Sequence, residues 1–132
     1  MKSYFTLSER RGHPVVLAFY PADNSPGCTA QLCRYQDEMD TFRDLGAEIW
    51  GISRQHTGSH EKFARTKRLG FPLLADEKGD VVSAYGVSLL GVGVRRSIFI
   101  IDAKGRIAWK NVALAGVTFQ SANTLKRELL KL

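Results

Sequence analysis

The sequence predicts an α/β fold, in which a central mixed β-sheet is flanked by helices on both faces. The chain has 132 residues, enough for one compact domain with a buried core, and we expect a single domain over residues 1–132. A short, almost continuous apolar run at residues 14–21 is typical of a strand buried on both faces of a sheet. Strand-like and helix-like segments alternate along the rest of the chain, which favours a sheet covered on both faces.

The predicted elements follow from apolar spacing and from the residues that end strands and helices. The first strand ends at Pro21, and a turn-rich stretch follows at 22–27. From Cys28 to about Leu45, apolar residues recur every three or four positions, which predicts a helix that ends at Gly46. The later elements are a strand at 47–53, a helix at 60–69, an extended piece at 71–74, a helical turn or two at 79–85, a hairpin formed by 96–102 and 106–112, and an amphipathic helix at 122–132.

Composition and charge argue against several classes of protein. The chain is 44% hydrophobic and 24% charged, which is ordinary for a soluble globular protein, and no apolar run approaches the length of a membrane span. The net charge of +6 comes from scattered basic residues without interleaved aromatics, which argues against a nucleic-acid partner. The first residues contain no apolar stretch of signal-peptide length, so we expect a cytoplasmic protein with no membrane partner.

The chain has two cysteines, Cys28 and Cys33, which are too few for a disulfide scaffold. Cys28 lies where the first predicted strand and its turn give way to the predicted helix. The N-terminus of a helix offers unpaired N–H groups and the positive end of the helix dipole, and both favour a thiolate over a thiol. Because the thiolate is the nucleophilic form, this placement indicates a chemical role for Cys28.

The stretch FYPADNSPGCT at 19–29 carries the most informative pattern. It holds Pro21, Ser25 and Cys28 in the arrangement Pro-x-x-x-Ser-x-x-Cys, which resembles the signature of the peroxiredoxins. Its wider context is similar to the bacterioferritin comigratory protein, or peroxiredoxin Q, subfamily. The resemblance continues through WGIS at 50–53, FPLLAD at 71–76, YGV at 85–87 and RSIFIID at 96–102. It implies a thioredoxin-like fold and a thiol-dependent peroxidase activity.

The resemblance also implies roles for individual residues. Cys28 would be the peroxidatic residue, whose thiolate attacks one oxygen of hydrogen peroxide or of an alkyl hydroperoxide. Arg96 matches the family's active-site arginine, and its guanidinium offers a planar set of donors to sulfur and oxygen together. Ser25 stands where threonine is commoner, and its hydroxyl can still donate to the peroxide, while Pro21 would shape the loop. Neither a metal nor an organic cofactor is needed.

Cys33 is the second residue to which the resemblance assigns a chemical role. It lies five positions after Cys28, where some members of the subfamily keep their resolving cysteine. It would condense with a sulfenic acid on Cys28 to an intramolecular disulfide, which a thioredoxin-like dithiol protein would reduce. The sequence leaves open whether the protein is a monomer or a weak dimer.

Each of these residues also has a plainer structural interpretation. Cys28 is also compatible with a small buried apolar residue, Cys33 with an idle thiol and Ser25 with a helix N-cap. Arg95 competes with Arg96 for the role of the active-site arginine.

The same residues are compatible with other functions, each with less support. Cys28-x4-Cys33 followed by His56-x3-His60 offers two thiolates and two imidazoles, but the gap between the pairs exceeds the usual zinc-finger spacing. A disulfide reductase typically carries Cys-x-x-Cys, which the chain lacks, and a non-enzymatic binding domain on the same fold remains an alternative. His13, His56 and His60 have no evident catalytic partner and are expected to be exposed.

Overall fold

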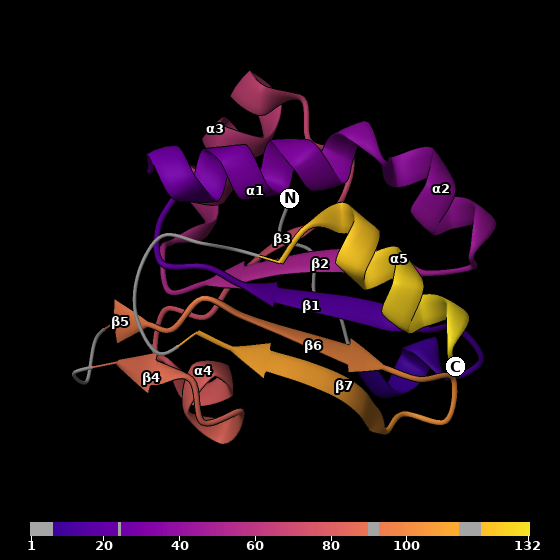
Figure 1. Ribbon diagram of the computed structural model, residues 1–132. Coiled ribbons are helices and arrows are strands. Elements are labelled where there is room, and N and C mark those ends of the chain that lie inside the picture. Colours follow the sequence, from indigo (N-terminus) through magenta and orange to yellow (C-terminus); the bar gives the residue numbers. More distant parts are fainter. Residues whose placement is uncertain (1–6, 24, 90–92, 114–119) are drawn as a thin grey trace.

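The computed structural model describes residues 7–23, 25–89, 93–113 and 120–132, and its centre is a five-stranded mixed sheet (Figure 1). The strand order is β3-β2-β1-β6-β7, in which β1, β2 and β3 are parallel to one another. Strand β6 runs antiparallel to β1, and β7 runs antiparallel to β6. The strand bounds are Val15–Phe19 for β1, Glu48–Ser53 for β2, Leu73–Ala75 for β3, Ser97–Ile101 for β6 and Ile107–Val112 for β7. The predicted mixed sheet is confirmed.

Strand β1 is the centre of the sheet because it hydrogen-bonds to β2 on one side and to β6 on the other. All five of its residues are buried, as the continuous apolar run predicts. Successive side chains point to opposite faces of the sheet. Val16, Ala18 and Tyr20 belong to one hydrophobic cluster, and Leu17 and Phe19 belong to the other. A continuous apolar strand therefore supplies two cores at once.

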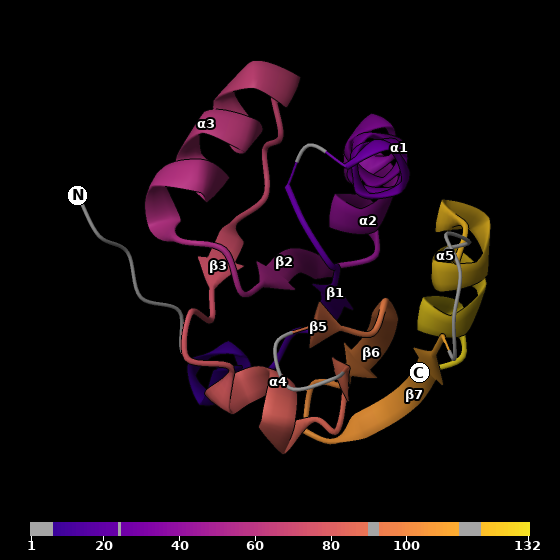
Figure 2. The ribbon, with the colours of Figure 1, turned by 90° about the vertical axis from the view of Figure 1, so that its left-hand side faces the viewer.

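Helices cover both faces of the sheet, as the sequence predicts (Figures 1 and 2). One face carries α1 (Pro26–Asp37), α2 (Met39–Asp44), α3 (Thr57–Lys67) and α5 (Ala122–Leu130). The other face is covered by the 3-10 helix η1 (Leu7–Arg10), by α4 (Asp80–Ala84) and by a small hairpin of β4 (Ser88–Leu89) and β5 (Gly93–Val94). In the part of the chain that the structure describes, no helix has the length and apolar character needed to cross a bilayer.

The predicted helix from Cys28 to about Leu45 is in fact two helices, α1 and α2, separated at Glu38. Glu38 has φ −109° and ψ 15°, and its amide donates to the Tyr35 carbonyl at 3.1 Å, so the regular i to i−4 pattern is interrupted there. Tyr35, Met39 and Phe42 nevertheless all pack into the same core cluster. The apolar spacing runs across the break, which is why it predicts one helix.

Candidate active site

The candidate site lies where β1 ends and α1 begins. Cys28 is the third residue of α1 and is fully buried. The helix opens with Pro26, which has no amide proton, and the amide of Thr29 donates to the Ser25 carbonyl at 2.8 Å. The amides of Gly27 and Cys28 consequently have no acceptor within the helix. These backbone donors and the positive end of the helix dipole are at the end of α1 that carries Cys28.

Arg96 brings a charged group to the same sulfur from a segment distant in sequence. It directly precedes β6, the antiparallel neighbour of β1, and its Nη2 lies 3.3 Å from Cys28 Sγ. Its Nη1 donates to Gln31 Oε1 at 2.5 Å. The arginine is 8% exposed, and its Nε has no hydrogen-bond partner among the described residues. A cation held this close stabilises a negative charge on sulfur and leaves a donor for a further oxygen atom.

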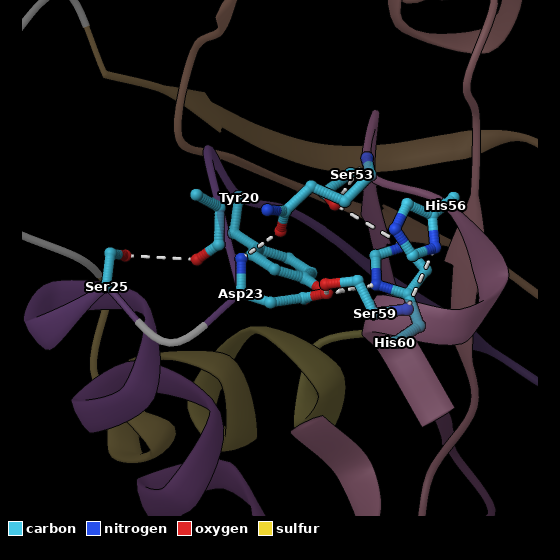
Figure 3. Close-up of polar contacts among 9 residues, drawn as sticks. Tyr20, Asp23, Ser25, Ser53, His56, Ser59 and His60 are labelled. Atoms are coloured by element: carbon cyan, nitrogen blue, oxygen red, sulfur yellow. Dashed lines mark hydrogen bonds and ion pairs between the residues drawn. The ribbon is translucent and has the colours of Figure 1, made fainter. Parts of the chain in front are cut away.

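Ser25 and Pro21 shape the turn between β1 and α1. Ser25 occupies the N-cap position of α1 with an extended backbone, but its side chain makes no capping hydrogen bond. Its hydroxyl instead donates to the Ala22 carbonyl at 3.0 Å (Figure 3). Pro21 is exposed in the bend that follows β1. Ser25 is thus the N-cap residue of α1 by position but makes no capping side-chain bond, and its role as a donor to peroxide stays a prediction.

Cys33 lies on the same helix as Cys28, in the next turn, and is half-buried. Both cysteines are free thiols. The structure thus places the two predicted reactive thiols on one intact helix, and brings Arg96 to Cys28.

A buried polar cluster that the sequence reasoning missed lies next to this site (Figure 3). Asp23, in the turn after β1, accepts from the Tyr20 hydroxyl at 2.5 Å, from the Ser59 hydroxyl at 2.6 Å and from His60 Nδ1 at 2.8 Å. Its amide donates to the side-chain carbonyl of Gln55. His60 is only 2% exposed, so the expectation of an exposed histidine is wrong. A carboxylate supplied by a distant turn partners its ring and offsets the cost of burying it.

The protonation states within this cluster follow from its hydrogen bonds. Burial by itself raises the pKa of Asp23, but the donors on His60, Ser59 and Tyr20 outweigh it and lower that pKa below its usual value. Because the carboxylate carries no proton, His60 must hold one on Nδ1. Burial, with Asp23 beside it, raises the pKa of Tyr20 far above its usual value, so the phenol keeps its proton. The cluster is a fixed set of donors around one anion.

The same cluster contains a serine, a histidine and an aspartate in the order found in the catalytic triad of serine hydrolases. Ser53 Oγ lies 3.4 Å from His60 Nε2, and His60 Nδ1 lies 2.8 Å from Asp23. Ser53, however, is completely buried at the end of β2, and its hydroxyl oxygen accepts the amide of Gln55 at 3.3 Å. Each of these groups is hydrogen-bonded to another buried group of the cluster, and we assign the cluster a structural role.

The metal-site alternative gains no support from the geometry. His56 is the N-cap of α3, and its Nδ1 accepts the amide of Ser59 at 3.1 Å. His60 is engaged with Asp23, while Cys28 contacts Arg96. Across residues 7–23, 25–89, 93–113 and 120–132, no three His, Cys, Asp or Glu side chains are grouped as metal ligands would be.

Comparison with known proteins shows which family the chain matches. A family model described as "AhpC/TSA family" matches residues 2–110. The chain is 42% identical over 106 residues to chloroplastic peroxiredoxin Q of Triticum aestivum, which covers 79% of this chain and 49% of that protein. It is 35% identical over 129 residues to peroxiredoxin Bcp of Bacillus subtilis, covering 91% of this chain and 82% of that protein. The chain thus spans about half the length of the chloroplastic relatives.

A solved structure agrees with these relatives. The bacterioferritin comigratory protein of Xanthomonas campestris, a protein with alkyl peroxide reduction activity, superposes with a TM-score of 0.85 at 26% identity. The superposition covers 96% of this chain and 84% of that one. A score of this size confirms the predicted thioredoxin-like arrangement of the sheet and helices.

The Asp23 cluster generates a prediction about stability. Because the pKa of Asp23 is lowered by folding, its contribution is fully present above the unfolded-state pKa of about 4 and is lost as the pH falls through the folded value. We expect Asp23→Asn to lower the free energy of unfolding by about 3–5 kcal/mol at pH 7, since it leaves buried donors without their anion. As the pH falls from about 5 through the folded-state pKa of Asp23, the variant should lose less stability than the wild type.

Urea unfolding of both proteins across this pH range measures the difference. Asp40→Asn is the matched control, because the Asp40 side chain is 96% exposed and pairs with Arg43 on the surface of α2. That change should stay within about 0.5 kcal/mol of the wild type. Equal stability of Asp23→Asn and wild type at pH 7 would contradict the prediction.

Proposed function

Because the chain belongs to the AhpC/TSA family, we propose that it is a thiol-dependent peroxidase that reduces hydrogen peroxide and alkyl hydroperoxides through Cys28. The observation that carries the proposal is the 3.3 Å contact between Arg96 Nη2 and the buried Cys28 Sγ at the start of α1. The peroxiredoxin relatives and the alkyl peroxide reduction activity of the Xanthomonas protein support the class of reaction.

In the first step, the Cys28 thiolate attacks one oxygen of the peroxide and the O–O bond breaks. The sulfur becomes a sulfenic acid, and the other oxygen leaves with the electron pair and takes a proton as water or an alcohol. Negative charge moves from sulfur to the leaving oxygen, so donors placed along that path stabilise the transition state. Arg96 and the amides at the start of α1 that have no acceptor within the helix would be such donors. Since Cys28 is fully buried, a peroxide reaches it only when neighbouring groups move aside.

In the second step, the Cys33 thiolate attacks the sulfenic sulfur and expels hydroxide, which leaves a Cys28–Cys33 disulfide. Ideal helix geometry puts residues five positions apart at roughly 8.7 Å between Cα atoms and about 140° around the axis. A disulfide needs Cα atoms within about 7 Å and converging Cβ atoms. The bond therefore requires the first turns of α1, about residues 28–34, to unwind.

The partners belong to this proposal too. Unwinding exposes the disulfide, and a thioredoxin-like dithiol protein reduces it by thiol–disulfide exchange. The cycle needs a supply of reduced dithiol, which fits a cytoplasmic location. We propose a monomer or a weak dimer as the working form, because the proposed cycle forms its disulfide within one chain.

The role of Arg96 is tested by substitution. We expect Arg96→Ala to slow oxidation of Cys28 by about 10²–10³-fold, because the buried donor to the transition-state charge is lost. Arg96→Lys should recover only part of the rate, since a point charge does not reproduce the guanidinium fork. Stopped-flow kinetics with hydrogen peroxide and an alkyl hydroperoxide gives these rates. Arg95→Ala is the control and should leave them near the wild-type values; an unchanged rate in Arg96→Ala removes Arg96 from the mechanism.

The role of Cys33 is tested by its serine variant. Cys33→Ser should react once with peroxide at the wild-type rate but fail to turn over with thioredoxin as the reductant. Its Cys28 sulfenic acid should persist or advance to sulfinic acid, which mass spectrometry detects. Cys28→Ser, as the paired variant, should not react with peroxide at all. Normal thioredoxin-linked turnover of Cys33→Ser would show that the resolving thiol lies elsewhere.

The unwinding of α1 is tested by hydrogen exchange. We expect amide protection across residues 28–34 to fall when the reduced protein is oxidised to the disulfide, because the helix cannot span the bond. Protection of α5, which packs on the same face of the sheet, should be retained and serves as the internal control. A disulfide-bonded protein with α1 fully protected would rule out the helical geometry used here.

A further inference from the structure

A line of buried polar groups continues from the candidate site into the body of the protein. Arg96, which contacts Cys28, donates through Nη1 to Gln31 Oε1. Gln31 Nε2 lies 3.1 Å from the Tyr35 hydroxyl, and that hydroxyl donates to the Gln120 carbonyl at 2.7 Å. Gln31 and Tyr35, like Cys28, have no exposed surface. The chemistry of the reaction leaves the Tyr35 hydroxyl without an assigned role.

The direction of every hydrogen bond in this line is determined. A guanidinium can only donate, so Gln31 presents its carbonyl oxygen to Arg96 and its amide nitrogen to Tyr35. The Tyr35 oxygen therefore accepts from Gln31, and its own proton goes to the Gln120 carbonyl. Burial raises the pKa of Tyr35 to about 12, although its hydrogen bond with Gln31 and the charge of Arg96 act in the opposite direction. The phenol keeps its proton at neutral pH and can act as donor and acceptor at once.

The line also connects two helices. Cys28, Gln31 and Tyr35 are spaced three and four residues apart on α1, so they share one side of that helix. Gln120 lies outside α1 and directly precedes Ser121, the N-cap of α5. The Tyr35 hydroxyl thus ties the side of α1 that carries the thiol to the segment before α5. Loss of the Tyr35 hydroxyl would leave the Gln31 amide without this acceptor. Gln31 would then hold the Arg96 guanidinium less firmly.

We propose that Tyr35 is a positioning residue: its hydroxyl fixes Gln31 so that Arg96 points at Cys28, and the same bond to the Gln120 carbonyl resists the unwinding of α1 that brings Cys28 to Cys33. This inference rests on the proposed peroxidase function. It implies that one hydroxyl affects two successive steps in opposite directions. The peroxide step is faster when the hydroxyl is present, and the formation of the disulfide is slower.

Tyr35→Phe tests the inference with the removal of one oxygen atom. The ring remains in its edge contact with Phe42, whose centroid is 6.5 Å away at 80°, so the core packing is kept. In a Cys33→Ser background, which isolates the first step, oxidation of Cys28 by hydrogen peroxide should be about 3- to 10-fold slower, as expected for the loss of one buried hydrogen bond. With Cys33 present, the fraction of Cys28 converted to sulfinic acid per turnover should fall by a similar factor.

Tyr85→Phe is the matched control. Tyr85 is half-buried on the opposite face of the sheet, where it packs against Phe19 and Phe99. The Tyr85→Phe substitution removes the same hydroxyl oxygen on the other face of the sheet. The rate of Cys28 oxidation and the sulfinic fraction should therefore keep their wild-type values. Hydrogen exchange of the reduced proteins adds a readout without peroxide, and protection at 28–34 should fall in Tyr35→Phe only.

The outcomes separate the inference from the function on which it rests. A wild-type chain whose Cys28 does not react with peroxide overturns the proposed function. The positioning role alone is overturned if the wild type reacts but Tyr35→Phe is only less heat-stable. In that case either its peroxide rate or its sulfinic fraction is unchanged or rises. A slower peroxide step together with a smaller sulfinic fraction supports it.

Discussion

A guanidinium held in the interior beside a thiol is the interaction on which the rest of the site depends. Arg96 is charged at every accessible pH, and a buried charge is costly unless it is paired and hydrogen-bonded. Here its partners are the Cys28 sulfur and the Gln31 carbonyl oxygen. Only a sulfur that carries negative charge compensates the guanidinium fully. A thiolate is the nucleophilic form of a cysteine, so a cation beside the sulfur favours the same form that reacts.

Helix α1 meets two opposing demands through this interaction. It is folded where it places Cys28 and Gln31 around Arg96, and in the proposed cycle it must unwind to bring Cys28 to Cys33. Oxidation links the two states, because a neutral sulfenic acid no longer compensates the guanidinium as a thiolate does. In the proposed cycle, the folded arrangement is therefore most stable before the peroxide reacts and loses part of its stabilisation immediately afterwards. The helix needs no separate signal to change state.

The sequence predicts the architecture well because the signals for it are local. The apolar run of β1 and the helical spacing in α1 and α5 depend on neighbouring residues only, and each is found in the structure. The break at Glu38 escapes prediction because the core-facing spacing continues across it. The small hairpin of β4 and β5 was likewise not predicted, because each strand has only two residues.

The parts of the site that depend on local sequence are also the parts that the sequence predicts. The placement of Cys28 at a helix start is local, whereas the contact of Arg96 depends on the pairing of β1 with β6. The sequence indicated Arg96 only through the family resemblance. No local pattern links Asp23 to His60. A topological argument does: β1 and β2 are parallel, so the residues that follow them meet at one edge of the sheet. Asp23 follows β1 and His60 follows β2, and both therefore lie at the edge that carries Cys28.

The buried Asp23 cluster also limits how far the rearrangement of α1 extends. The partners of Asp23 are Tyr20 at the end of β1, Gln55 after β2, and Ser59 and His60 on α3. These groups belong to the sheet and to α3, so unwinding of α1 leaves their bonds intact. Asp23 lies three residues before the first residue of α1, and it fixes the chain at that point. In the proposed cycle, an anchor at Asp23 would limit the movement of Cys28 to a short path, which would keep it within reach of Cys33 and return it to Arg96 after reduction.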